Sequence, residues 1–270
     1  MKIGIVGCGA IGKTICRAFD QGIINAHLTA LSDRDPVSAQ ELADSLVNIR
    51  PRVMDTSALI DAVDLVVECA AQSAVPDIVI PALEKGRDVM IMSIGALTDE
   101  RLWRRIKSLA SEHDCRVYLP SGAIVGLDGL KSASMAKMSS VMLITRKHPS
   151  GFQGAPYIEQ HKIDLNALKK ATIIFEGCAE DAVRAFPANV NVAATLSLAG
   201  IGTKNTRVRI IADPALSRNV HEIYVEGEFG KFETRVENVP SPDNPRTSYL
   251  AALSTIATLK KIVDEIQIGT

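Results

Sequence analysis

Short apolar runs alternate with segments of helical periodicity from residue 3 to about residue 125. The runs are rich in Val and Ile, as buried strands are, and the segments between them repeat their apolar residues at helical spacing. This alternation predicts a doubly wound α/β domain with a parallel sheet. We expect strands at residues 2–6, 28–32, 65–68, 89–92 and 116–119, and helices at 11–19, 39–45, 75–84 and 99–113.

The pattern changes after Pro120. A small-residue helix is expected at 124–138, and Gly-containing turns separate several later strands, which favours a mixed or antiparallel sheet. After a turn at 241–245, apolar residues recur at helical spacing and predict a closing amphipathic helix. We therefore expect an α+β second domain at 123–245 and a helix within 246–270 that packs back on the first domain, residues 1–122. The expected strands are 141–145, 172–176, 206–212, 222–226 and 232–236.

Composition excludes several classes of partner. Lys and Arg number 30 against 31 Asp and Glu, without long runs of one sign, so we expect no nucleic-acid partner. No segment reaches the roughly 18 unbroken apolar residues of a membrane helix, and the start MKIGIVG is typical of a buried strand rather than a signal peptide. Five scattered cysteines without a C-x-x-C pair argue against disulfides and against a metal site. The chain is expected to be cytoplasmic and to act on a small molecule.

A glycine-rich motif, GCGAIG, follows the first expected strand and precedes the first helix. Gly7 permits a tight turn, Gly9 lets the backbone approach a pyrophosphate, and Gly12 allows close packing of helix on strand. The helix N-terminus, at Ala10 and Ile11, offers amide groups to the phosphates. This context predicts a dinucleotide-binding domain.

An acidic residue, Asp33, ends the second strand 21 residues after Gly12. Its carboxylate can accept hydrogen bonds from the adenosine ribose hydroxyls, which favours NAD. Arg34 follows directly and can stack on adenine or meet a 2′-phosphate. The predicted cofactor is therefore NAD or NADP.

Six segments spread over nearly the whole chain resemble the L-aspartate dehydrogenase family. They occur in the expected order and are GCGAIG at 7–12, SIGAL at 93–97, LPSGAIVGLDGL at 119–130, TRKHP at 145–149, FPANVNVAATLSLAG at 186–200 and ADPALSRNVHEI at 212–223. The resemblance implies oxidation of L-aspartate to iminoaspartate by NAD or NADP. The imine is then hydrolysed to oxaloacetate and ammonia or passed to pyridine-nucleotide biosynthesis.

The resemblance also implies functional residues in the second domain. The catalytic histidine of the family falls on His221, and the contacts on the nicotinamide side fall on Ala123 and Asn191. An imidazole with a pKa near 6.5 can take a proton from the substrate ammonium or activate water. The Asn191 carboxamide complements that of nicotinamide, although the residue could instead cap the following helix.

A dicarboxylate substrate needs cationic partners. Arg146, Lys147 and Lys162 are the candidates, because Arg and Lys form charge-assisted hydrogen bonds with carboxylates.

Three further hypotheses remain from the sequence. A two-domain reductase of the homoserine dehydrogenase or dihydrodipicolinate reductase kind shares the expected architecture, and architecture does not fix chemistry. A module that senses NAD without turnover would share the cofactor site. A homodimer is expected from the family and from the strands at 222–236, which could present a sheet face to a partner.

Overall fold

The computed structural model describes the chain except for residues 188–190, 242–243 and 270, and the side chains of 244–247. The chain divides into two compact units. The first contains Met1–Pro120 together with Ala252–Gln267, and the second contains Ser121–Ala251. Within the described residues, no helix is long and apolar enough to cross a membrane.

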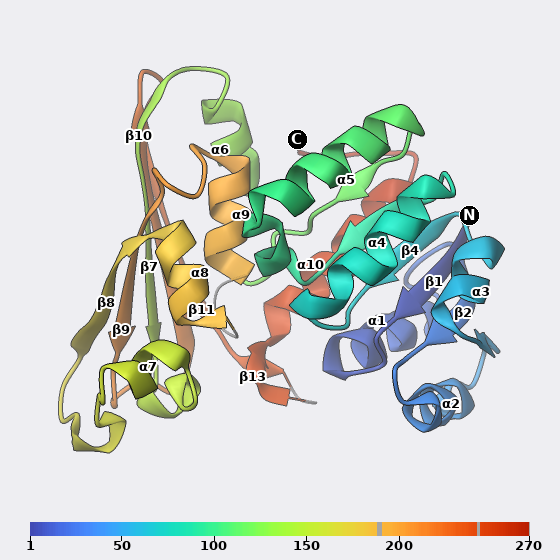
Figure 1. The fold of residues 1–270 in the computed structure, drawn as a ribbon, viewed down its shortest axis with the longest axis horizontal. Helices are drawn as coiled ribbons and strands as arrows, with labels where there is room; N and C mark the ends of the chain where they lie inside the picture. The colour runs from blue at the N-terminus through green and yellow to red at the C-terminus, as the bar shows by residue number, and fades with distance from the viewer. Residues whose placement is uncertain (188–190, 242–243, 270) are drawn as a thin grey trace. The chain divides into compact units, whose positions relative to one another are not determined.

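The first unit is built on a six-stranded sheet in the order β3-β2-β1-β4-β5-β6, with every neighbouring pair parallel (Figure 1). The doubly wound sheet expected from the sequence is confirmed. Its strands are β1 (Lys2–Val6), β2 (His27–Ser32), β3 (Arg52–Val53), β4 (Leu65–Glu68), β5 (Asp88–Ile91) and β6 (Val117–Tyr118). Its helices are α1 (Ala10–Asp20), α2 (Pro36–Ser45), α3 (Thr56–Ala62), α4 (Val75–Glu84) and α5 (Glu100–Glu112), with short 3₁₀ turns η1 (Gln72–Ala74) and η2 (Ile94–Thr98).

Helices cover both faces of this sheet. Ile3 and Ile5 of β1 pack on α1, α2 and α10, whereas Gly4 between them faces Leu59 of α3. Successive side chains of a strand point to opposite faces, so a strand covered on both sides must be apolar throughout. This explains why continuous apolar runs located these strands so well.

The closing helix, α10 (Tyr249–Val263), places Leu259 in the core of the first unit. The hydroxyl of Thr255 on the same helix lies 2.9 Å from the sulfur of Met92. The helix begins later than expected, because Asn244–Ser248 forms strand β13, paired with β12 (Pro240–Ser241). The expected turn at 241–245 is therefore partly strand.

The second unit holds a five-stranded sheet in the order β11-β10-β7-β9-β8. Its strands β7 and β9 are parallel and the other neighbours are antiparallel, so the expected mixed sheet is confirmed. The strands are β7 (Met138–Lys147), β8 (Thr172–Cys178), β9 (Arg207–Ala212), β10 (Asn219–Gly227) and β11 (Gly230–Asn238). The helices and 3₁₀ turns are α6 (Leu127–Ala133), η3 (Pro149–Phe152), α7 (Pro156–Gln160), η4 (Leu165–Ala167), α8 (Ala179–Ala185) and α9 (Asn191–Ala199).

The helix expected at 124–138 was predicted too long. Gly126 precedes α6 in a left-handed conformation, with φ of 86°. At the other end, Met138 already belongs to β7 and pairs with Gly227 of β10. The helix itself ends at Ala133, and the four residues between it and β7 belong to neither element.

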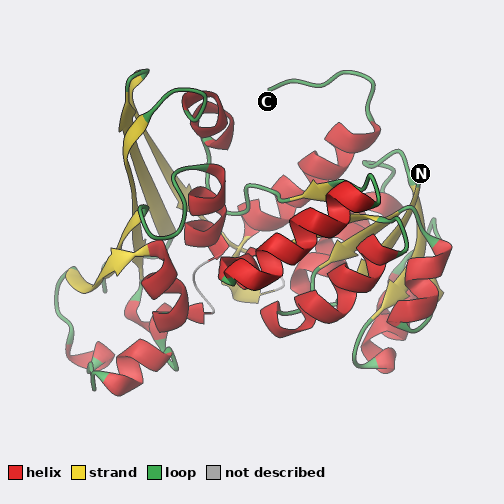
Figure 2. Cartoon of the chain, turned by 45° about the horizontal axis from the view of Figure 1, so that its top comes forward, coloured by secondary structure: helices red, strands yellow, loops and turns green. Residues whose placement is uncertain are grey.

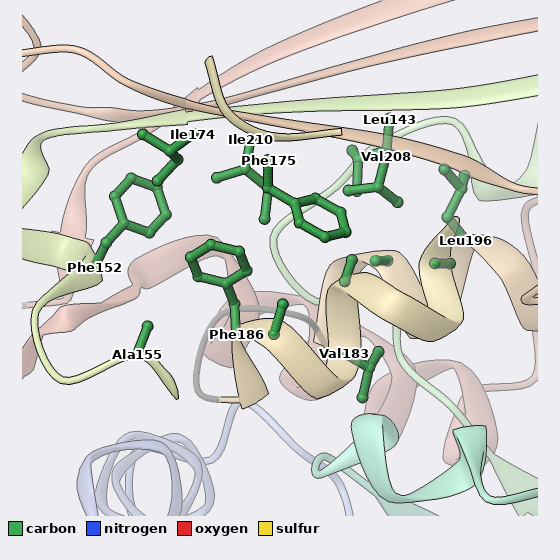
Figure 3. Packing of buried hydrophobic residues seen from close by; sticks show 14 of the residues in the cluster. Leu143, Phe152, Ala155, Ile174, Phe175, Val183, Phe186, Leu196, Val208 and Ile210 are labelled. Atoms are coloured by element: carbon green, nitrogen blue, oxygen red, sulfur yellow. The ribbon is translucent and has the colours of Figure 1, made fainter. Parts of the chain in front are cut away.

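Within the second unit, all helices that the structure describes lie on one side of the sheet (Figure 2). On the covered side, the rings of Phe152, Phe175 and Phe186 point toward one another (Figure 3), and Phe186 lies edge-on to both others. On the other side, Tyr224 of β10 is 39% exposed between the buried Ile223 and Val225. We call this uncovered side the open face.

Candidate active site

The glycine-rich loop joins β1 to α1 at the carboxyl edge of the first sheet. Gly7 has φ of 104°, and a side chain there would come within 2.5 Å of the Cys69 carbonyl. A side chain at Gly12 would collide with the carbonyl oxygen of Gly7, whereas one at Gly9 would meet nothing within 4 Å. Two glycines are therefore required by the loop itself, and Gly9 leaves space above it.

The first turn of α1 provides amides beside that space. Gly9 is the N-cap residue and, among the described residues, no side chain caps the helix. The first backbone bond of the helix runs from the Lys13 amide to the Gly9 carbonyl. The amides of Ala10 and Ile11 can therefore donate to a phosphate, as anion sites at helix N-termini do.

The carboxylate of Asp33 is fixed beside the glycine-rich loop. It accepts hydrogen bonds from the amides of Cys8, at 2.7 Å, and Asp35, at 2.9 Å. The oxygens retain lone pairs for ribose hydroxyls. Arg34 is exposed next to it. The residues of this edge fit a bound dinucleotide.

Glu68, at the end of β4, is a residue that the sequence analysis missed. It is fully buried, and its carboxylate accepts four hydrogen bonds at 2.7 to 3.1 Å, from the amides of Ala70, Met92 and Ser93 and from the Ser93 hydroxyl. Burial raises the pKa of this carboxyl despite the four donors. Glu68 thus connects the segments that follow β4 and β5. An acidic residue closing the apolar run LVVE was the available signal.

His221 lies on β10, an interior strand of the second sheet, and is 2% exposed. It is paired in register with Thr145 of β7, and its Nδ1 lies 3.0 Å from the Thr145 hydroxyl. Burial, followed by the positive charge of Lys147, lowers the pKa of His221 to about 3. The ring is therefore neutral at neutral pH, because burial and the Lys147 charge both hold the pKa below the ordinary value of 6.5.

Lys147 follows Thr145 by two residues on β7, so it points to the same side of the sheet as His221. It is 8% exposed, and burial lowers its pKa to about 8. Its methylene groups pass Gly151 of η3, where a side chain would stand 3.7 Å from them. The Lys147 amine, the His221 imidazole and the Thr145 hydroxyl are thus buried polar groups on the covered side of the sheet.

The structure does not bring Arg146 and Lys162 to this place. Arg146 points to the open face, where its Nε lies 3.2 Å from the Glu222 carboxylate. The Glu222 carboxylate also forms an ion pair with Arg235, with 2.7 Å between Arg235 Nη1 and Glu222 Oε1. Lys162 is exposed after α7 in a left-handed conformation, with φ of 50°.

The two residues expected on the nicotinamide side belong to separate segments of the second unit, Ala123 to the connection before α6 and Asn191 to α9. Ala123 is buried, and its carbonyl accepts a hydrogen bond of 2.9 Å from the Asn238 side chain. Asn191 is the first residue of α9 and is exposed. Its carbonyl accepts a bond from the Thr195 hydroxyl one turn later.

Sequence comparisons agree with this arrangement. A family model described as "Homoserine dehydrogenase, NAD binding domain" matches residues 7–120, and one described as "Aspartate dehydrogenase, C-terminal" matches residues 128–262. The chain is 61% identical to an L-aspartate dehydrogenase of Methanosarcina acetivorans, with 100% of both chains covered. It is 46% identical to one of Methanothermobacter thermautotrophicus, covering 100% of this chain and 99% of the relative.

Solved structures show the same relationship. Aspartate dehydrogenase from Thermotoga maritima matches with a TM-score of 0.77 at 30% identity, covering 100% of this chain and 99% of that one. A scyllo-inositol dehydrogenase from Lactobacillus casei, solved with NAD(H) and scyllo-inositol, matches with a TM-score of 0.59 at 15% identity, covering 97% and 88%, which shows the fold alone.

The parallel sheet, the glycine-rich loop and the second mixed sheet define a two-unit dehydrogenase of the dinucleotide-binding class. Within that class, the chain belongs to the L-aspartate dehydrogenase family.

Proposed function

We propose that the protein oxidises L-aspartate to iminoaspartate with NAD or NADP, and that water then converts the imine to oxaloacetate and ammonia. The names of the relatives support this proposal. The single observation that carries it is the presence of two buried titratable groups, His221 and Lys147, on the covered side of the second sheet. Buried groups of this kind, with displaced pKa values, gather at functional sites.

The first unit supplies the cofactor site in this proposal. Gly9 leaves room for the pyrophosphate, the amides of Ala10 and Ile11 donate to it, and Asp33 accepts from the adenosine ribose. A dinucleotide held there would supply the acceptor for the hydride that leaves Cα of the substrate. Because the Asp33 carboxylate is held in place by two amides, a 2′-phosphate would meet a fixed negative charge, so we expect NAD to be preferred.

The second unit, which we propose as the catalytic and dimerisation domain, supplies the substrate site. His221 contacts the substrate, while Ala123 and Asn191 contribute on the nicotinamide side. Lys147 pairs with one substrate carboxylate through a charge-assisted hydrogen bond, since it lies on the same side of the sheet as His221. Arg146 is left out, because it faces the other side of the sheet and already pairs with Glu222.

The test is the formation of reduced nicotinamide by purified protein, followed by its absorbance. L-aspartate is compared with D-aspartate, L-glutamate, L-homoserine and L-malate, each with NAD and with NADP. Turnover confined to L-aspartate supports the proposal. Turnover of L-homoserine instead would indicate the related reductase class. Binding of NAD without turnover of any of these substrates would indicate a sensing module.

We also propose that the protein is a homodimer joined through the open face. The support is an uncovered sheet on which Tyr224 and Ile173 are exposed by 39% and 53%. A sheet face that no helix covers can pair with the same face of a second copy. Light scattering should give about twice the chain mass of 29.0 kDa. A single species at the chain mass would exclude the dimer.

A further inference from the structure

The hydroxyl of Thr145 is the partner of His221 Nδ1, at 3.0 Å. Both side chains are nearly inaccessible, with exposures of 4% and 2%. They stand directly opposite each other on β7 and β10, next to the terminal pair Val220–Arg146 of the antiparallel ladder. The contact is therefore fixed by the register of the sheet.

The direction of this hydrogen bond decides where the imidazole carries its proton. A hydroxyl has one proton and two lone pairs, and a neutral imidazole has one donor and one acceptor nitrogen. In the described part of the chain, Nδ1 of His221 is the one hydrogen-bond partner of the Thr145 hydroxyl. If Nδ1 donated, the hydroxyl proton would be buried without an acceptor, at a cost of about 1–3 kcal/mol. If the hydroxyl donates, the proton left without a partner is the one on Nε2, the ring nitrogen that contacts the substrate in the proposed function.

We infer that Thr145 is a positioning residue that donates to Nδ1 and thereby holds His221 as the tautomer with its proton on Nε2. The catalytic meaning of this inference rests on the proposed function. Nε2 then offers the substrate a hydrogen-bond donor, which suits a carboxylate oxygen of aspartate. In this tautomer Nε2 has no lone pair free to accept the proton that the substrate ammonium loses.

The electrostatics of the site agree with a neutral donor. Burial and the nearby charge of Lys147 oppose protonation of the ring, and the pKa of His221 is about 3. A ring that stays neutral keeps one proton, and the Thr145 hydroxyl directs it to Nε2. Thr145 and Lys147 therefore act on the same ring in complementary ways, one through the tautomer and the other through the charge.

The direct test is nitrogen NMR of the full-length protein labelled with ¹⁵N-histidine, without cofactor or substrate. The chain has five histidines, and His221→Gln identifies the signals of His221. We expect a protonated Nε2 and an unprotonated Nδ1 in the wild type and in Thr145→Ser, which keeps the hydroxyl. In Thr145→Val, which keeps the shape, we expect the Nδ1-protonated tautomer to become populated. A protonated Nδ1 in the wild type, or an unchanged tautomer in Thr145→Val, would overturn the inference.

Activity gives an independent readout once turnover of L-aspartate is established. The side-chain amide of Gln donates from about the position of Nε2 but cannot act as a base, whereas Ala does neither. We expect His221→Gln to keep kcat within about tenfold of wild type and His221→Ala to lose about 100-fold or more. Equal loss in both variants would rule out the donor role. Thr145→Val should lower kcat about fivefold with KM for NAD unchanged, and Thr145→Ser should restore it.

The NMR and activity experiments distinguish failure of the proposed function from failure of the inference about Thr145. If the wild type turns over no L-aspartate but shows the Nε2-protonated tautomer, the proposed function fails and the assignment of the tautomer stands. If L-aspartate is oxidised and Nδ1 carries the proton, the proposed function stands and the role of Thr145 is wrong.

Discussion

In the first unit, helices cover both faces of the sheet, and in the second unit they cover one. The strands of the first sheet therefore carry mostly apolar side chains. The candidate site of this unit consists of backbone amides and carboxylates at the carboxyl edge of the sheet. The second sheet carries His221 and Lys147 on the strands themselves, on the covered side. In the first sheet, the groups proposed to bind a ligand therefore lie at the carboxyl edge. In the second sheet, they are side chains that project from interior strands of the sheet.

The largest effect is expected in the glycine-rich loop of the first unit. Gly12→Ala would force a methyl group into the Gly7 carbonyl, which is backbone and has no room to move. We expect a loss of about 3 kcal/mol in the free energy of unfolding, together with loss of NAD binding. Urea unfolding and titration of NAD fluorescence quenching measure the two effects.

Gly9→Ala is the matched control for that loop. Its added methyl group meets nothing within 4 Å, so stability should change by less than about 1 kcal/mol while NAD binding weakens at least tenfold. If NAD binds equally well to Gly9→Ala, the pyrophosphate does not pass over this residue. The edge of the first sheet would then not be the cofactor site as proposed.

The next effect concerns the buried amine of the second sheet. Burial lowers the pKa of Lys147 from 10.5 to about 8, so the unfolded chain binds more protons between these two pH values. Stability of the wild type relative to Lys147→Met should therefore rise as the pH increases from 8 to 10.5. Below pH 8, Lys147→Met should be more stable by on the order of 3 kcal/mol. Urea unfolding of both proteins across this range measures the difference.

The same variant tests the substrate site. Removing the cation should raise KM for L-aspartate at least tenfold, with KM for NAD unchanged. Equal affinities for L-aspartate would mean that Lys147 holds no substrate carboxylate. A pH-independent difference in stability would mean that the amine is less buried than its position on β7 requires.

The comparison of the two sheets also explains how much could be predicted from the sequence. Strands β1 and β4 and helix α4 match their predicted bounds, because continuous apolar runs and helical spacing are local signals. The two-residue strand β3 and the short helix α3 escaped prediction, since neither is long enough to show a period. The glycines and Asp33 were found for a similar reason, as their spacing along the chain is part of the motif.

The second site was only partly predictable. His221 came from the family resemblance and Lys147 from its charge, but the contact between His221 and Thr145 depends on a register that joins residues 76 positions apart. Arg146 was a plausible ligand by type, and only the alternation of β7 shows that it faces the other side. Side-chain roles that depend on which strands pair lie beyond local patterns.

A smaller effect is expected for the carboxylate that connects two segments of the first unit. Glu68→Gln keeps the shape but replaces one acceptor oxygen with an NH₂ group that faces backbone donors. We expect a loss of about 2 kcal/mol in stability, because buried donors lose their acceptor. Glu68→Asp keeps the charge but shortens the side chain by one methylene group, so it tests whether the carboxylate must reach the amides of both segments. If Glu68→Gln is as stable as wild type, the buried carboxyl is already protonated in the folded protein.

The smallest effect on stability should come from the ion pairs of the open face. Arg235 is half exposed, and Arg146 remains as a partner for Glu222 when Arg235 is removed. Arg235→Ala should therefore change the free energy of unfolding by less than about 1 kcal/mol at a fixed oligomeric state, with kcat unchanged. The same substitution should weaken a dimer joined through this face, which analytical ultracentrifugation over a range of concentrations would detect. A large loss of stability in a species that stays monomeric would show that the open face stabilises the single chain, and the contrast between a covered side that carries chemistry and an open side reserved for association would then be wrong.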